Sequence, residues 1–250
     1  MKTIKLQLAI VAAGLAGVMA TPSAFAYTGL DGTLNFGPST FQYNNGGEFN
    51  AVTTPFGSSP NLGSFATFCI EDLENIGQPP SGPYTYTINT GAVQGGGPSG
   101  GAYATDPNTG LSMDNISIGT AWLYSQFTAG TLTLDNGTGS YFDANRLANA
   151  GELQQAIWCL EDENGGVNNG YVSLAETALG NLTFAQVQTD SGGAYGVVVL
   201  NMFADGNLAQ DQLAVQDQMI VIPEPTTTGC FLLGLGALIC SWRFNKDKRT

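Results

Sequence analysis

Short runs of apolar and β-branched residues, separated by residues that favour turns, dominate the middle of this 250-residue chain. Such runs, when Gly, Pro, Asn or Asp bound them, predict β-strands. The predicted strands are 32–36, 63–70, 84–88, 131–134, 194–202 and 218–222. Between 91 and 110 the residues are mostly Gly, Pro, Asn and Thr with no hydrophobic face, which predicts an exposed loop.

Two longer segments instead repeat their apolar residues at steps of three and four, the period of an amphipathic helix. These predicted helices are 116–127 and 144–163. A third, shorter helix is predicted over 173–179, because Ser173 can cap it and Glu176 follows three residues later. Strands and helices together predict a mainly β fold with a few α-helices (α+β), in a single domain.

The N-terminal end has the three parts of a secretory signal peptide. Lys2 and Lys5 precede a mostly apolar stretch, 6–19, and Ala24-Phe25-Ala26 places small residues where signal peptidase cleaves. We therefore assign residues 1–26 to a signal peptide and expect the mature chain to begin at Tyr27. Its cysteines then face an oxidising compartment.

The C-terminal end, 223–250, also has three parts. Pro223-Glu224-Pro225 stops any helix or strand that precedes it. The apolar stretch 229–242 has 14 residues, about 21 Å of helix, against the roughly 20 residues that an ordinary membrane-spanning helix needs. A basic end follows, which the positive-inside rule keeps in the cytoplasm.

This arrangement closely resembles the PEP-CTERM sorting signal of Gram-negative bacteria, which an exosortase recognises. The resemblance implies an exported protein that its C-terminal helix anchors transiently in the inner membrane. It also implies a final location at the cell surface or in the exopolysaccharide and biofilm matrix, where extracellular polysaccharide is a candidate partner. An ordinary C-terminal membrane anchor is the alternative.

The charge of the region between these two ends excludes several classes of partner. Residues 27–222 contain 18 of the 20 acidic residues but only one of the seven basic residues, Arg146, so their formal net charge is −17. Such a surface repels nucleic acid and anionic lipid. The chain has no His, which excludes His-ligated metals and His acid–base catalysis. Since no nucleophile–base pair or phosphate-binding loop is recognisable, we expect a protein that is not an enzyme.

Three segments of this region carry candidate chemistry: an aromatic-Cys-apolar segment at 67–71, a Gln-rich helix at 153–158 and a final strand at 216–220. In this order they resemble the thioester domains of bacterial surface adhesins. The resemblance implies that Cys69 and a late glutamine condense to an internal thioester. The thioester would then attach the protein covalently to an amine-bearing surface or matrix partner.

The match to that family is incomplete. Leu153 stands where the TQxA-type helix motif has Thr, whereas Gln154, Ala156 and Trp158 match it. The resemblance implies that Gln154 forms hydrogen bonds around the site, while Trp158 is more simply a core residue.

Two glutamines compete for the late position of the motif. Gln216, Gln218 and Ile220 share one strand face at period two. We favour Gln218, with Gln216 as the alternative, because apolar residues follow Gln218.

A disulfide between Cys69 and Cys159 is the principal alternative to a thioester. It would close a loop of about 90 residues and stabilise the fold by roughly 4–5 kcal/mol. The two fates exclude each other at Cys69, and the disulfide implies a non-reactive structural matrix protein. Proximity of the Cys69 sulfur to a late glutamine favours the thioester, and proximity to Cys159 favours the disulfide.

A third hypothesis is a calcium- or glycan-binding β module. Calcium takes several oxygen ligands, and acidic clusters occur at 71–74 and 161–164. Neither cluster has the spacing of an EF-hand loop. We therefore expect no cofactor, with calcium as the one candidate ion.

Overall fold

The structure is a computed structural model. It describes residues 30–38, 41–43, 46–72, 76–77, 81–93, 103–105, 112–134, 137–163, 165–204 and 214–222. The expected signal peptide, 1–26, and the expected sorting signal, 223–250, lie outside the described residues. No helix within the described ranges is long and apolar enough to cross a membrane.

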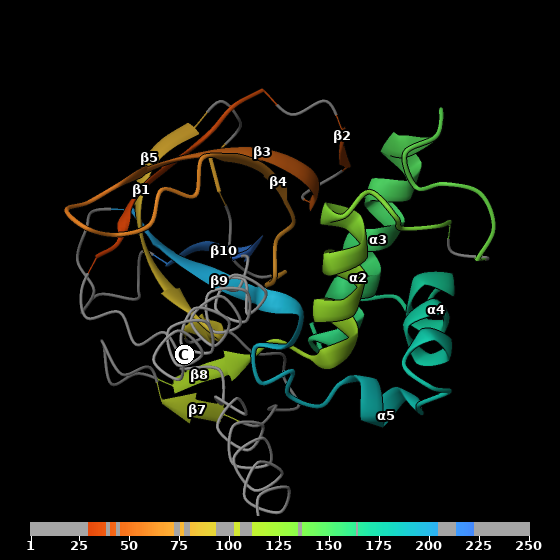
Figure 1. Cartoon of the computed structure of the whole chain (residues 1–250). Coiled ribbons are helices and arrows are strands. Elements are labelled where there is room, and N and C mark those ends of the chain that lie inside the picture. The colour runs from red at the N-terminus through yellow and green to blue at the C-terminus, as the bar shows by residue number, and fades with distance from the viewer. Residues whose placement is uncertain are drawn as a thin grey trace, which may run out of the picture.

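A seven-stranded antiparallel sheet forms most of the fold (Figure 1). Its hydrogen-bonded order is β10-β9-β5-β1-β3-β2, and β4 also pairs with β3. The strands are β1 (Gly32–Phe36), β2 (Phe41–Tyr43), β3 (Gly46–Pro55), β4 (Ser64–Thr67), β5 (Ser81–Asn89), β9 (Val197–Phe203) and β10 (Ala214–Val221). A smaller antiparallel sheet has the order β6 (Gly91–Val93), β8 (Ser112–Asn115) and β7 (Tyr103–Thr105).

The large sheet curls until the chain just beyond β4 meets β10. An antiparallel bridge joins Cys69 to Gln218. On either side of it, Ile70 N donates to Asp217 O at 3.1 Å and Met219 N donates to Phe68 O at 3.4 Å. We call this junction, Phe68–Ile70 against Asp217–Met219, the seam.

Four α-helices in the described part lie on one side of the curled sheet (Figure 1). They are α2 (Ile118–Thr128), α3 (Arg146–Leu160), α4 (Gly170–Ala178) and α5 (Phe184–Val187). Side-chain caps start two of them: Ser117 accepts from Thr120 N at α2, and Asn169 accepts from Tyr171 N at α4. Such caps satisfy backbone donors that have no partner inside the helix.

Two hydrophobic cores result from this arrangement. The sheet core fills the inside of the curl, and all its buried members except Trp158 come from strands or the seam: Leu34, Phe36, Phe49, Ala51, Cys69, Tyr86, Ile88, Val198, Leu200, Met202, Val215 and Ile220. The helix core lies between the helices and the outer face of the seam and β9. Because strand residues alternate between faces, Cys69 faces the sheet core while Phe68 and Ile70 face the helix core.

The described residues confirm a mainly β fold with a few helices, and the three predicted helices correspond to α2, α3 and α4. The predicted cap of the third helix is wrong, because Asn169 caps α4 and Ser173 lies inside it. The predicted strand 131–134 is also wrong. That segment leaves α2 in a turn, with Thr131 N and Leu132 N both donating to Gln126 O.

Strand β3 was not predicted, because Gly, Asn and Thr interrupt its apolar residues. Pairing with β1, β2 and β4 nevertheless makes it central to that end of the sheet. The expected exposed loop 91–110 is wrong at its start, since Gly91–Val93 forms the buried strand β6, and again at Tyr103–Thr105, which forms strand β7. Tertiary pairing has overridden weak local strand preference in each of these strands.

Candidate thioester site

Cys69 and Gln218 face each other across the seam. The Cys69 Sγ lies 3.3 Å from Gln218 Nε2, and neither residue has any solvent exposure. The flanking backbone bonds make this a non-hydrogen-bonded antiparallel pair, the type in which Cα atoms are about 4.5 Å apart and side chains are closest. The sheet therefore places a thiol against a side-chain amide without help from a loop.

Gln154 of α3 holds the backbone of Cys69. Its Oε1 accepts from Cys69 N at 3.1 Å and from Gly47 N at 3.2 Å, and its Nε2 donates to Cys69 O at 2.7 Å. An amide that bonds both the N–H and the C=O of one residue fixes the orientation of that peptide. Helix α3 thus reaches over the seam and positions the thiol.

The two late glutamines have different partners. Gln218 Nε2 contacts the Cys69 sulfur and also donates to Gln216 O at 3.0 Å. Gln216 Nε2 donates instead to Glu71 O, so the structure brings Gln218 and not Gln216 to Cys69. An irregularity in the β9–β10 register lies between Val215 and Gln218, and the simple period-two pattern of the sequence does not hold across it.

The other residues of the helix motif lie in the two cores. Leu153 and Ala156 are fully buried in the helix core, so the departure from the Thr of the motif adds an apolar side chain to that core. Trp158 points the other way, into the sheet core beside Cys69, and is 7% exposed. Its Nε1 and the Oε1 of Gln218 are both buried and have no hydrogen-bond partner in the described structure.

Cys159 does not meet Cys69. Both cysteines of the described residues are free. Cys159 is only partly buried and packs against the helix core, whereas its neighbour Trp158 enters the sheet core. Successive residues of a helix point about 100° apart, so α3 directs Cys159 away from the seam.

Burial controls the ionisation of the Cys69 thiol. Loss of solvent raises its pKa well above the usual value, and the negative charges of Glu71 and Asp217 raise the pKa further. The contact with Gln218 opposes these effects only in part. The thiol is therefore protonated at neutral pH.

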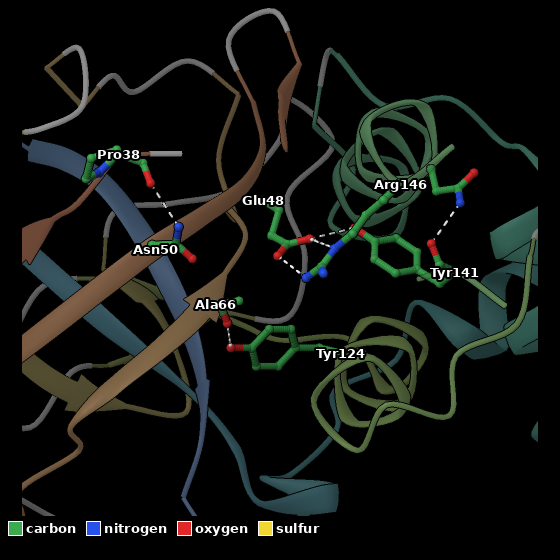
Figure 2. A network of polar contacts seen from close by, with 8 residues as sticks. Pro38, Glu48, Asn50, Ala66, Tyr124, Tyr141 and Arg146 are labelled. Atoms are coloured by element: carbon green, nitrogen blue, oxygen red, sulfur yellow. Dashed lines mark hydrogen bonds and ion pairs between the residues drawn. The ribbon is translucent and has the colours of Figure 1, made fainter. Parts of the chain in front are cut away.

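Side chains to which the sequence assigned no role brace the seam. The Tyr124 hydroxyl lies 2.9 Å from Ala66 O (Figure 2). It also lies 2.8 Å from Met219 O and can donate to either oxygen. Thr67 Oγ1 donates to Met219 O at 2.7 Å. Gly47, which shares Gln154 with Cys69, was also missed. The adjacent pair of glycines at 46–47 was its only signal in the sequence.

The acidic clusters do not form a metal site in the described part of the chain. No group of three or more Asp, Glu or Cys side chains there is placed to hold a metal ion. Their carboxylates instead accept from the protein: Glu71 Oε2 from Asp217 N at 3.1 Å, Glu161 Oε1 from Ser117 Oγ at 2.7 Å, and Glu163 Oε2 from Asp72 N at 3.3 Å. Residues 73–75 and 164 of the clusters lie outside the described residues.

Comparison with known proteins found no match among protein families, curated proteins or solved structures. The geometry of the seam is therefore the basis for a function. Its distinguishing features are a neutral thiol, a primary amide in contact with it, and a helix side chain that orients the thiol. Together these are the components of an internal thioester.

Proposed function

We propose that Cys69 and Gln218 form an internal thioester through which this protein attaches covalently to an amine-bearing partner. The observation that carries the proposal is the 3.3 Å separation of Cys69 Sγ and Gln218 Nε2 in a fully buried strand pair. A thioester needs Cys and a side-chain amide in contact, and the two meet here from opposite ends of the domain sequence.

Formation of the bond needs no external base. Cys69 Sγ attacks Cδ of Gln218, the C–N bond breaks, and the thiol proton leaves with the nitrogen as ammonia. Because the thiol is neutral and lies against Nε2, its proton has a short path to the leaving group. The same burial excludes water, which protects the thioester from hydrolysis.

Use of the bond regenerates the thiol. An amine nitrogen attacks the thioester carbonyl, the C–S bond breaks, and the amine proton passes to the departing sulfur. The partner is then joined to the former Gln218 side chain by an amide. The protein undergoes this reaction once, so it is an attachment module and not an enzyme.

The location that suits this chemistry is outside the cell. We infer export by the N-terminal signal, recognition of 223–250 by an exosortase, and residence at the surface or in the exopolysaccharide matrix. The lack of Lys in residues 27–222 is compatible with the thioester, because such a domain cannot acylate itself through lysine. A covalent link also resists shear better than a weak reversible contact.

Intact mass of the protein purified from its secreting cells tests the proposal. A thioester lowers the mass by about 17 Da through loss of ammonia, and methylamine then adds across the bond. Cys69→Ala should abolish both changes, and Cys159→Ala should preserve both. A loss of only about 2 Da, insensitive to methylamine, would show the Cys69–Cys159 disulfide and overturn the thioester.

A further inference from the structure

The proposed thioester is inaccessible in this conformation. Cys69 and Gln218 have no exposure, and Gln154 beside them is 1% exposed. An amine cannot reach the carbonyl unless something that covers it moves. The covering element is identified by what packs on Gln154 and Trp158, the two α3 side chains that enclose the seam.

That element is the start of β3. Gly47 N donates to Gln154 Oε1, the same oxygen that accepts from Cys69 N. A Cβ on Gly46 would lie 2.5 Å from Gln154 Cγ and 2.8 Å from Trp158 Cη2. The backbone of Gly46, which has no side chain, therefore packs directly against both residues.

This part of β3 extends beyond the body of the sheet. Pairing with β4 begins at Phe49 and pairing with β1 begins at Ala51, so Gly46–Glu48 pairs only with β2. We call β2 (Phe41–Tyr43) together with Gly46–Glu48 the arm. Among the described residues, the arm contacts α3 and, through Glu48, Tyr141 in the turn before α3.

One cluster of contacts fastens the arm (Figure 2). The buried Glu48 carboxylate forms an ion pair with Arg146 and accepts from Tyr141 Oη at 3.2 Å. The Arg146 guanidinium lies 4.4 Å from the ring centroid of Phe41 and 4.9 Å from that of Phe142. Arg146 is the only basic residue of 27–222, so this is the one ion pair with a cationic side chain that this region can form.

Helix geometry connects this cluster to the seam. Gln154 and Trp158 are four residues apart on α3, so their side chains are neighbours on one helix face. Arg146 precedes Gln154 by eight residues, which is about 12 Å along the helix and about 80° around its axis. The arm contacts Arg146 at one place and Gln154 and Trp158 at another, so the contacts with Arg146 help to hold it over the two residues that enclose the seam.

We propose that the arm is a lid over the thioester and that the Glu48–Arg146 pair is its latch. The proposal rests on the proposed thioester, whose reactivity the lid would regulate. With the latch closed, the bond is shielded from water and stray amines. Opening of the arm admits the acceptor amine to the carbonyl.

The test compares the native chain with the double variant Glu48→Gln, Arg146→Met. Both charges are removed together because a single removal would leave a buried charge without its partner. We expect the thioester mass loss to persist and the rate of methylamine addition to rise roughly tenfold, as for loss of a partly exposed ion pair and its ring contacts. Phe41→Ala, which changes no charge, should raise the rate in the same direction. Glu152→Gln, on the exposed face of α3, is the matched control and should leave the rate unchanged.

A second measurement separates the lid from the thioester. In a Gln218→Ala background no thioester can form, and the rate at which iodoacetamide alkylates Cys69, located by peptide mass, reports opening alone. We expect the double variant to accelerate this alkylation by a similar factor. Equal rates with and without the latch, in both assays, would overturn the lid. Faster alkylation in a protein that never shows the mass loss would support the lid and overturn the thioester.

Discussion

The sheet core and the helix core each have one of the two cysteines of residues 27–222, and the surroundings of the two thiols differ. Cys69 belongs to the sheet core, is fully buried, contacts a glutamine amide and has its backbone held by Gln154. Cys159 packs against the helix core, is partly buried and meets a glutamine amide through its backbone, since Gln188 Nε2 donates to Cys159 O at 3.1 Å. Both pKa values are raised by burial, so neither thiol is activated as a thiolate.

The difference teaches that position, and not acidity, makes Cys69 the reactive candidate. A low thiol pKa is the usual mark of a reactive cysteine. Here the neutral thiol is an advantage, because condensation with an amide requires a proton for the leaving nitrogen. Contact with Gln218 and exclusion of water therefore decide the chemistry.

The largest expected effect separates the two cysteines by stability. A Cys69–Gln218 bond closes a loop of roughly 150 residues, and its loss should lower the free energy of unfolding by about 5 kcal/mol in the chain-entropy model. We expect Cys69→Ala to lose this amount and Cys159→Ala to lose only about 1 kcal/mol from packing. Urea denaturation of the two variants against the native chain measures the difference. Equal losses would indicate a disulfide and would remove the contrast between the cysteines.

A somewhat smaller effect concerns the residue that positions Cys69. Gln154→Leu removes three hydrogen bonds and leaves the N–H and C=O of Cys69 buried without partners. Each such loss costs about 1–3 kcal/mol, so we expect roughly 4 kcal/mol and a lower fraction of molecules with the thioester mass. The neighbouring Gln155 is only partly buried, and Gln155→Leu is the control. A full thioester yield in Gln154→Leu would show that α3 does not position the thiol.

The smallest expected effect is a pH-dependent change in the free energy of unfolding. It comes from Glu161 at the end of α3, on the helix side of the comparison. Burial raises the pKa of Glu161 to about 7, against the hydrogen bonds it accepts from Ser117 N and Oγ. An acid whose pKa is raised in the folded state binds more protons in the folded than in the unfolded protein. Its contribution to the free energy of unfolding is therefore full below pH 4.5 and is lost as the pH rises through 7. Relative to Glu161→Gln, the native chain should lose about 3 kcal/mol between pH 4.5 and pH 8.

Chemical denaturation of both proteins across this pH range provides the measurement. Asp114, whose pKa burial raises to about 6, adds a trend of the same sign to both proteins, and its charge also contributes to the raised pKa of Glu161. If the difference in unfolding free energy between the native chain and Glu161→Gln did not change with pH, Glu161 would be solvated in the folded protein. The Cys69 thiol should not take part in this transition, because burial raises its pKa well above this range.

The sequence predicted elements well where local pattern and tertiary burial agree. Strand β1 occupies its predicted range, and α2 and α3 begin and end within a few residues of theirs. Prediction failed at β3 and at 131–134 for opposite reasons. Polar residues conceal a strand that three partner strands stabilise, whereas the apolar run at 131–134 pairs with no strand among the described residues and turns back on α2.

The candidate site, too, could be predicted from the sequence only in part. The sequence identified Cys69, Gln154 and Gln218 as candidate site residues. It also left Gln216 and Cys159 as alternative partners of Cys69, because each has suitable chemistry. The register irregularity before Gln218 separates the two glutamines, and the rotation along α3 separates the two cysteines. Neither separation has a signal in local sequence.

The sequence by itself determined which chemistry residues 27–222 can perform, since composition excludes histidine catalysis, lysine crosslinks and a basic binding surface. It also determined that the final strand carries glutamines immediately before the expected sorting signal. The tertiary structure alone decided which thiol meets which amide and what covers them. The physical reason is that Cys69 and Gln218 are adjacent only because the sheet curls on itself, and the Glu48–Arg146 pair joins β3 to α3 only once that curl has formed.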